Sequence, residues 1–426
     1  MIDIRLIRKN WQEVEAKLRH KEPTVELAPI VALDEEIRDT KTQVEKLKAK
    51  RNEVSQQIGV LKRQGKDATD LMHEVGAHAE QIHSLDNRLT ELEAHFIDLL
   101  ARLPNLPMDD ITISQSPQDN VVIKEVGKKP TFDFPFKNHL ELNERLNLFD
   151  FKRGAKLAGT GWPVYRNLGA RLEWALINYM IGIHLKNGFM QWMPPVVVRR
   201  DVMFASGQLP KFDNQQFKIE DKDFHFYLIP TAEVSLNGLH SEEVIPEGEL
   251  PLKYVAYTPC FRREAGAAGS QERGLIRMHQ FNKVEMFCFA KPEESSAVFE
   301  MMMASAEEIL NGLGLHYRNA LLVTGDMSFA SARTIDIEVW LPGQNRYYEV
   351  SSVSNCTDYQ SRRANIRFRN KEDKLEYVHT LNGSGLATSR LMVALLENNQ
   401  NADGSVNIPA VLQPYLGGLK KLVPEE

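Results

Sequence analysis

Two long stretches near the start of the chain repeat apolar residues at alternating intervals of four and three positions. Residues 31–62 carry Leu33, Ile37, Val44, Leu47, Val54, Ile58 and Leu61, and residues 69–101 carry Leu85, Leu89, Leu92, Phe96 and Leu99. Such intervals form the seam of a coiled coil, here with polar gaps at Thr40 and Arg51. A short turn with Gly65 joins the stretches. We therefore predict an antiparallel helical arm over about 31–101, each helix roughly 50 Å long.

From about residue 131 the pattern changes to short apolar runs separated by turn residues. Three helices are predicted, at residues 171–188, 293–314 and 388–399, and five strands, at FHFYLIP, LKYVAYTPCF, IRMHQFNKVEMFCFA, TIDIEVWL and NRYYEVSSV. A further strand-like run, FMQWMPPVVV, contains a double proline that is typical of a sheet edge or a strand end. Many strands and few helices indicate an α+β fold with an antiparallel β-sheet flanked by helices.

A proline-rich segment, PNLPMDD, lies between the two patterns and reads as a linker. We therefore predict an N-terminal domain over residues 1–110, which contains the α-helical antiparallel coiled-coil arm, and a catalytic domain over residues 111–426.

Composition adds few constraints. The 426 residues are 42% hydrophobic and 26% charged, with a net charge of -6, so any surface that binds nucleic acid must be local. The three cysteines are widely spaced, which suits neither a disulfide framework nor a zinc site and favours a cytoplasmic protein. No apolar run predicts a signal peptide or a membrane span.

The charge of the arm is unevenly distributed. Residues 38–66 contain nine basic and three acidic side chains, whereas residues 67–100 contain eight acidic side chains and one basic. One reading is a solvated coiled coil whose two helices attract each other. The other is that the first helix contacts a polyanion, since a lysine-rich helix can neutralise phosphates.

The segment CFRREAGAAGSQERGLIRMHQFNKVEMF, residues 260–287, combines charge with strand character around a glycine-rich loop. Strand alternation would place Cys260, Arg262 and Glu264 on one face, and Arg277, His279, Phe281, Lys283 and Glu285 on one face of the return strand. Arginine forks bind phosphate and an exposed phenylalanine can stack on a base, so a nucleotide site is one interpretation. A ladder of ion pairs on a solvated sheet is the other.

Other candidates are weaker alone. Arg390 follows LNGSGLA, which we read as a glycine-rich turn before a helix, although a solvent-facing helix arginine is the better reading of this residue in isolation. Glu349, near Ser351 and Ser352, could hold Mg²⁺, which prefers oxygen ligands, or be an ordinary strand carboxylate. Neither G-x-x-x-x-G-K-[ST] nor a strand-linked G-x-G-x-x-G occurs, which argues against P-loop and dinucleotide folds.

In order along the chain, TAE, FRRE, GLIRMHQFNKVE, EVSSVSNCTDYQSRR and LNGSGLATSR resemble the seryl-tRNA synthetases of bacterial type, a family of class II aminoacyl-tRNA synthetases. The resemblance covers both the arm and the catalytic body, and the ordered set is specific although each piece is weak. It implies ATP-dependent attachment of L-serine to tRNA(Ser) and tRNA(Sec) through a seryl-adenylate. It also implies a homodimer built on the double-proline strand, with Mg²⁺ and without zinc.

The resemblance also implies roles for individual residues. The catalytic residues would be Arg262, Glu285 and Arg390. Those that bind ATP would be Arg262, Arg263, Glu264, Arg277, Met278, Phe281, Glu349, Val350, Ser351, Ser352 and Arg390. Serine would be bound by Thr231, Ala232, Glu233, Arg262, Glu285 and Ser384, the last where the family often has threonine. The tRNA variable arm would contact Lys41, Lys48, Lys50, Arg51 and Lys62.

Mg²⁺ would be bound by Glu349 and Ser352. Strict strand alternation instead pairs Glu349 with Ser351, so this assignment requires a bulge or a strand end. Three alternatives to the serylating enzyme are a homologue that charges another acceptor, a non-catalytic tRNA-binding paralogue, and a structural coiled-coil protein. The first usually lacks the arm, the second should have lost the key arginines, and the third leaves the order of the motifs unexplained.

Overall fold

The computed structural model describes residues 1–264 and 274–424. The chain divides into two compact units, Ile2–Leu103 and Pro104–Glu426, with Met1 belonging to the second. The glycine-rich loop of the 260–287 segment lies largely outside the described residues. The predicted boundary after residue 110 remains a prediction.

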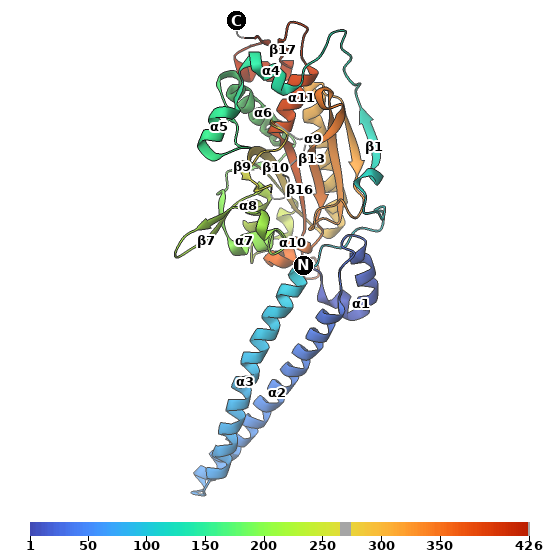
Figure 1. Ribbon diagram of the computed structural model, residues 1–426. Helices are drawn as coiled ribbons and strands as arrows, with labels where there is room; N and C mark the ends of the chain where they lie inside the picture. The colour runs from blue at the N-terminus through green and yellow to red at the C-terminus, as the bar shows by residue number, and fades with distance from the viewer. Residues whose placement is uncertain (265–273, 425–426) are drawn as a thin grey trace. The chain divides into compact units, whose positions relative to one another are not determined.

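The first unit is the predicted helical hairpin preceded by a short helix. Helices α1 (Ile4–Arg19), α2 (Ala28–Arg63) and α3 (Thr69–Ala101) make up the unit, and α2 and α3 pack along each other (Figure 1). The predicted seam is confirmed on α2, where Leu33, Ile37, Thr40, Val44 and Val54 are buried. Its polar gap is satisfied because the Thr40 hydroxyl donates to the Glu36 carbonyl at 2.8 Å.

The second unit is built on an eight-stranded sheet in the order β1-β11-β12-β13-β16-β10-β9-β4. Its pairs are antiparallel, except that β4 runs parallel to β9. The strands are β1 (Val121–Val126), β4 (Met190–Trp192), β9 (Leu252–Phe261), β10 (Gln280–Ala290), β11 (Tyr317–Leu321), β12 (Arg333–Leu341), β13 (Arg346–Asn355) and β16 (His379–Ala387). The antiparallel core flanked by helices is thus confirmed.

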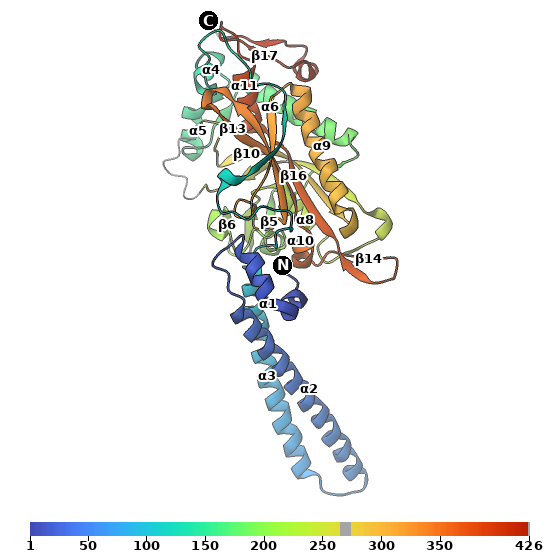
Figure 2. The same cartoon turned by 90° about the vertical axis from the view of Figure 1, so that its right-hand side faces the viewer.

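Helices cover both faces of the sheet. On one face, α6 (Asn167–Lys186), α9 (Ser295–Leu313) and α11 (Thr388–Asn398) join the even-numbered positions of β10 in the main core, and α9 lies along β16 and β13 (Figure 2). On the other face, α8 (Ala232–Gly238) and α10 (Tyr359–Ala364) pack near Phe287 and Phe289. Because side chains alternate along a strand, Phe281, Lys283 and Glu285 share this second face.

Smaller elements complete the second unit. The helices are α4 (His139–Leu146), α5 (Phe151–Ala158) and α7 (Arg200–Ala205). The short strands are β2 (Phe149–Asp150), β3 (Val164–Tyr165), β5 (Val197–Arg199), β6 (Lys218–Glu220), β7 (His225–Leu228), β8 (Val244–Ile245), β14 (Arg367–Arg369), β15 (Leu375–Tyr377), β17 (Val406–Asn407) and β18 (Lys421–Leu422). The double proline at 194–195 separates β4 from β5, and β4 is an edge strand as predicted.

Two local predictions are wrong. LNGSGLA is not a turn but part of β16, because glycine at 383 and 385 lets α9 and α6 approach the sheet closely. A Cβ at Gly385 would lie 2.3 Å from His184 Nε2, and one at Gly383 would lie 3.3 Å from Met302 Cε. The strand predicted from residue 276 begins only at Gln280, because the backbone N–H of His279 donates to the Gly161 carbonyl and its ring stacks on Trp162.

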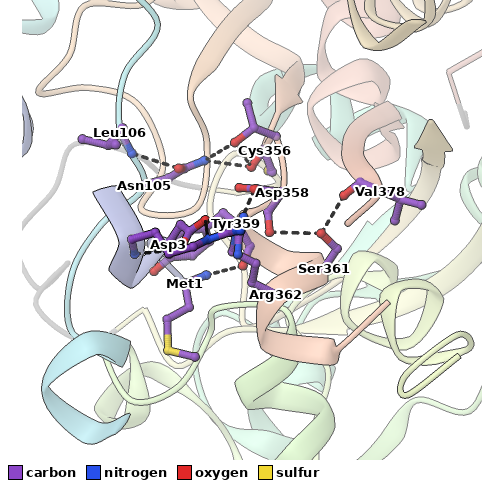
Figure 3. A network of polar contacts seen from close by, with 12 residues as sticks. Met1, Asp3, Asn105, Leu106, Cys356, Asp358, Tyr359, Ser361, Arg362 and Val378 are labelled. Atoms are coloured by element: carbon purple, nitrogen blue, oxygen red, sulfur yellow. Dashed lines mark hydrogen bonds and ion pairs between the residues drawn. The ribbon is translucent and has the colours of Figure 1, made fainter. Parts of the chain in front are cut away.

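Asn105 anchors the start of the second unit to loops beside the sheet. Its side-chain amide donates to the carbonyls of Cys356 at 2.8 Å and Ala330 at 2.9 Å, and its side-chain oxygen accepts from the Leu106 backbone N–H (Figure 3). Nearby, the Ser361 hydroxyl donates to the Val378 carbonyl and the Met1 amine donates to the Tyr359 carbonyl (Figure 3). Polar groups buried in these loops are therefore satisfied.

Candidate active site

A cavity of about 390 Å³ opens on the sheet face that carries Phe281 and Lys283. Its walls come from the ends of β9 and β10, from β13 and β16, and from the first turns of α8 and α11. Most of the predicted site residues line it: Thr231, Glu233, Arg262, Glu264, Arg277, Met278, Phe281, Glu349, Ser352, Ser384 and Arg390. Residues separated by up to about 160 positions in sequence thus meet in one hollow.

The arginines are held by partners around the cavity. Arg277 pairs with Glu264, with 3.0 Å between Nη1 and Oε2, and the Glu264 backbone has a left-handed φ of 47°. The Arg262 guanidinium lies 5.1 Å from the centre of the Phe281 ring. Arg390 Nη1 donates to the Glu349 carbonyl at 2.8 Å and pairs with Oε2 of the same residue at 3.2 Å. These cations, set beside an aromatic ring, can bind a polyphosphate and a flat base.

A bulge in β13 brings Glu349 and Ser352 to the same cavity. The register with β12 pairs Glu338 with Glu349 but Ile337 with Ser351, so Val350 has no partner. The irregularity that the sequence required is therefore confirmed. Val350 packs in the main core, and the Ser351 hydroxyl is buried and donates to the Ser384 carbonyl at 2.6 Å, so neither lines the cavity.

Asp336 lies behind these two residues, directly opposite Ser352 in the ladder. Its burial, and next the negative charge of Glu349, raise the pKa of Asp336 well above its ordinary value. Its Oδ1 atom has no hydrogen-bond partner among the described residues. An unpartnered carboxylate oxygen beside two further oxygen ligands is a donor set that suits Mg²⁺. Across residues 1–264 and 274–424, no group of three or more His, Cys, Asp or Glu side chains is arranged to hold a metal.

Polar residues of α8, β10 and β16 form a compact group in the same cavity. Thr231 caps α8, and its hydroxyl donates to Glu285 Oε2 at 3.0 Å. The register between β10 and β16 places Glu285 directly opposite Ser384. Glu285 is 1% exposed and is not itself a lining residue, but it adjoins the cavity through its partners Thr231 and Ser384, which line it.

Glu233 lies in the first turn of α8, where its carboxylate accepts hydrogen bonds from Gln360 and from Asn382. Burial is the main reason that its pKa rises to about 7, and the negative charge of Glu285 acts in the same direction. Lys283 opposes the shift. A cationic ligand would oppose it too and would draw Glu233 into its ionised form.

Three further predicted residues are not lining residues of the cavity. Arg263 donates to the Asn214 carbonyl at 3.1 Å, Ala232 is buried within α8, and Glu285 lies behind Thr231. Residues that the sequence reasoning did not assign also contribute, namely Lys283, Asn382, and the wall segments 206–208 and 328–330. Lys283 could have been identified from the sequence, because strand alternation places it on the same face as Phe281 and Glu285. The wall segments carry no pattern that would have identified them.

A buried carboxylate on α6 connects two of the elements that form the cavity. Glu173 is 4% exposed, and its Oε1 accepts hydrogen bonds from Asn282 on β10 at 2.9 Å and from Thr388 at the start of α11. Its Oε2 has no partner among the described residues, and burial raises the pKa of Glu173 from 4.5 to about 7. It therefore holds Phe281 and Arg390 in place through their neighbours.

Replacing Glu173 with glutamine should raise the melting temperature most at pH 8 and clearly less at pH 5.5. A carboxyl with a raised pKa in the folded state loses stability as pH rises from 4.5 through about 7, and the full shift corresponds to about 3 kcal/mol. Glutamine keeps an acceptor for Asn282 and Thr388. Thermal unfolding at both pH values tests this, with Glu173→Ala as the variant that loses the bonds. A glutamine variant less stable than the wild type at pH 8 would contradict the account.

Comparisons with known proteins agree with this architecture. Residues 1–107 match the family described as Seryl-tRNA synthetase N-terminal domain, and residues 217–399 match the tRNA synthetase class II core domain (G, H, P, S and T). The chain is 54% identical to the serine–tRNA ligase of Chlamydia pneumoniae and 53% identical to that of Chlamydia felis (strain Fe/C-56). Both alignments span 426 residues and all of each chain.

Solved structures resemble the whole chain as well. Seryl-tRNA synthetase from Pyrococcus horikoshii, complexed with ATP, has a TM-score of 0.93 at 37% identity, and the match covers 100% of both chains. Cytoplasmic serine–tRNA ligase from Naegleria fowleri, in complex with AMP, has a TM-score of 0.88 at 27% identity, and the match covers 100% of this chain and 99% of that one. Both helical hairpin and sheet thus have counterparts in known proteins.

Proposed function

The chain belongs to the seryl-tRNA synthetase family of class II aminoacyl-tRNA synthetases, and from that premise we propose that it esterifies tRNA(Ser) with L-serine through a seryl-adenylate. It is an ATP-dependent serine–tRNA ligase. The observation that carries the two-step route is the single cavity in which three arginines and a phenylalanine adjoin the group formed by Thr231, Glu285 and Ser384.

ATP would occupy the arginine-lined part of the cavity. The adenine ring would stack between Phe281 and the Arg390 guanidinium, Glu264 would bond its edge, and the Met278 backbone would contact the nucleotide. Arg262 would neutralise the α-phosphate, while Arg277 and Arg390 would bind the β- and γ-phosphates. Arg277 and Arg390 are already paired with Glu264 and Glu349, so nucleotide binding would exchange these partners for phosphate oxygens. Arg263, Val350 and Ser351 could contribute only through their backbone.

L-Serine would bind at the group around Glu285. Thr231, Glu233 and Glu285 would hold its ammonium, with Ala232 contributing its backbone. Arg262 would hold its carboxylate beside the α-phosphate. Glu285 and Ser384, which face each other across the ladder, would hold its hydroxyl. Alanine offers no hydroxyl to these two buried groups, and a site built to bond a hydroxyl rejects such an analogue by about 10⁴-fold.

Chemistry in this site consists of two substitutions that need no nucleophile from the protein. A serine carboxylate oxygen attacks the α-phosphorus, and the bond to the bridging oxygen breaks, so that pyrophosphate leaves. The 3′-hydroxyl of the terminal adenosine of tRNA then attacks the carbonyl carbon of seryl-adenylate, and AMP leaves. The chain's contribution is to align the reactants and to offset the negative charge that builds up at the phosphorus.

Mg²⁺ would be held by Glu349 and Ser352, with the unpartnered oxygen of Asp336 behind them. When bound, it would supply positive charge for the phosphates of ATP. The chain's own arginines would orient the same phosphates. Omitting Mg²⁺ should abolish activation, and activity that survives chelation would argue against a metal at this position.

The helical arm would bind the tRNA. We assign residues 1–110 to a tRNA-binding domain and residues 111–426 to the catalytic domain. Lys41 and Lys48 pair with Glu93 at 2.7 Å and Asp86 at 3.5 Å, whereas Lys50 and Lys62 are exposed and have no ion pair in the described structure. Some lysines of α2 would therefore pair with acidic residues of α3, and others would contact the phosphates of tRNA. Because tRNA(Ser) and tRNA(Sec) share a long variable arm in this family's substrates, we include both.

Assembly and location complete the proposal. The edge strand β4 leaves Met190 58% exposed and the following Met193 88% exposed, and Trp174 on the adjacent α6 is 55% exposed. Apolar side chains at a sheet edge suit a homodimer contact. Sedimentation should give about twice 48.6 kDa, and a monomer would contradict it.

The three cysteines are buried and form no disulfide in the described structure. This favours the reducing cytoplasm, and fractionation of cells would test it. Across the described residues, no helix has both the length and the apolar character that a membrane crossing requires.

The direct test is ATP–pyrophosphate exchange without tRNA, measured with each of the twenty amino acids in the presence of Mg²⁺. Exchange with serine alone is the expected result, followed by charging of tRNA(Ser) and tRNA(Sec) transcripts. Exchange with a different amino acid would contradict the serine pocket. No exchange with any amino acid would contradict the adenylate route and favour the tRNA-binding paralogue.

A further inference from the structure

Lys283 places an ammonium group inside the proposed serine pocket. It lies on β10 between Phe281 and Glu285, on the same face of the strand, and lines the cavity while only 8% exposed. Its Nζ atom forms an ion pair with Glu285 Oε2 and donates to Thr231 Oγ1 at 3.1 Å. A buried lysine with both partners satisfied is a fixed part of the pocket, because breaking such a pair is costly.

The charged groups around Lys283 come from three elements. Glu285 lies on its own strand, Glu233 lies on α8, and Cys260 and Arg262 lie at the end of β9. Burial raises the pKa of both Glu233 and Cys260, and the positive charge of Lys283 acts against each rise. Lys283 therefore supports the ionised state of Glu233.

Counting these charges shows what the pocket can accept. Two carboxylates, Glu233 and Glu285, face one fixed ammonium, so one unit of negative charge remains for a cationic ligand. Arg262 is left to meet a substrate carboxylate. An α-amino acid carries one ammonium and one carboxylate and so would neutralise the pocket, which lowers the cost of burying all these charges together.

We infer that Lys283 is a positioning and specificity-determining residue for serine: its ammonium holds the Glu285 carboxylate and the Thr231 hydroxyl in place and sets the pocket charge to match one substrate ammonium. This inference rests on the proposed function. Lys283 does not touch the reacting phosphorus or carboxylate, so it acts through Glu285 and Thr231. Without it, the negative charge of Glu285 would favour a proton on Glu233, and that proton would compete with the substrate ammonium.

The experiment compares Lys283→Met, which keeps the length of the side chain but removes the charge, with Lys283→Arg, which keeps the charge. Lys253→Met is the matched control, because Lys253 lies on neighbouring β9 and contacts the Asn187 carbonyl outside the cavity. Pyrophosphate exchange gives KM for serine and for ATP at pH 6.5 and pH 8.5. Thermal unfolding reports whether each variant is folded.

For Lys283→Met we expect the serine KM to rise about 100-fold, with the ATP KM within about threefold of the wild type. Its kcat/KM for serine should rise about tenfold between pH 6.5 and 8.5, more steeply than that of the wild type. Lys283→Arg should keep a pH profile like that of the wild type. Equal changes in both KM values, or a steep profile in the arginine variant, would overturn the inference. If the methionine variant does not fold, the arginine profile decides alone.

The wild type separates this inference from the function on which it rests. Serine-dependent exchange by the wild type, together with an unchanged serine KM in a folded Lys283→Met variant, would remove the role of Lys283 and leave the function intact. Absence of serine-dependent exchange in the wild type would remove both.

Discussion

Replacing Arg262 with alanine is expected to lower the rate of serine-dependent pyrophosphate exchange by about 10³-fold, and tRNA charging with it. Arg262 stands at the end of β9 with its guanidinium over Phe281, where we propose that it meets both the α-phosphate and the serine carboxylate. Removing one fixed donor from a site of charge development costs about 10²–10³ in rate, and Arg262 serves two such groups. Initial rates at saturating ATP and serine measure the effect.

Two further variants serve as controls for Arg262→Ala. Lysine at position 262 keeps the charge but lacks the planar fork, so it should recover only part of the rate. Arg199 pairs with Asp201, and its side chain is 71% exposed. Replacing Arg199 with alanine should leave both reactions unchanged. Normal exchange in a folded Arg262→Ala variant would remove Arg262 from the proposed chemistry. Among residues 1–264 and 274–424, the hydrogen bond found for the Arg262 side chain is a long one, to the Pro230 carbonyl at 3.4 Å, so folding should survive.

Reversing the charge at both Lys50 and Lys62 is expected to raise the KM for tRNA by about 10- to 100-fold while leaving exchange without tRNA unchanged. Both lysines are exposed on α2, so the change should not disturb the helical seam. If each neutralises one phosphate, the slope of log affinity against log salt should also fall by about two. Charging assays over a range of tRNA and salt concentrations measure both quantities.

A double reversal at Lys371 and Lys374 is the matched control, since it alters net charge equally on an exposed loop of the second unit. It should leave tRNA charging close to that of the wild type. Equal loss in the control would mean that net charge rather than the arm governs tRNA binding. A parallel loss of exchange and charging in the Lys50/Lys62 variant would mean that the arm variant damages the catalytic unit.

The sequence predicted an element of this fold well where residues within that element decide its structure. The strand LKYVAYTPCF coincides with β9, because its aromatic and β-branched residues favour an extended backbone within the segment itself. The arm helices were found to within a few residues, because a repeated seam averages over many turns. Each of these elements carries its own pattern.

Failures arose where distant segments decide the local structure. Glycines at 383 and 385 suggested a turn, yet they serve the close approach of α9 and α6 to the sheet, which no local pattern records. The strand before Gln280 was predicted too long, because the backbone at His279 is bound to Gly161. The importance of Glu173 depends on Asn282 and Thr388, more than one hundred positions away.

The charged residues of the candidate site were easier to predict from the sequence than the residues that form its walls. Charged residues are costly to bury without partners, so Arg262 and Glu285 stood out by type within the 260–287 segment. Arg390 was assigned by the resemblance. Lys283 stood on the predicted face but had no assigned role. Segments 206–208 and 328–330 line the cavity mainly with small or apolar residues. Residues of these types do not indicate a functional site in a sequence.

The unpaired residue at Val350 has a consequence for how this strand can vary over evolution. Because Glu349 and Ser352 reach the same cavity only across one extra residue, the spacing between them matters as much as their identities. Another apolar side chain at position 350 would preserve the register. A deletion there would leave one residue between Glu349 and Ser352, and regular alternation would then keep both oxygens on the cavity face. At the present length, loss of the bulge would instead turn one of the two oxygens into the core. The length of this segment and its bulge are therefore coupled, so lineages that keep the site should keep the extra residue and the bulge together or lose both together.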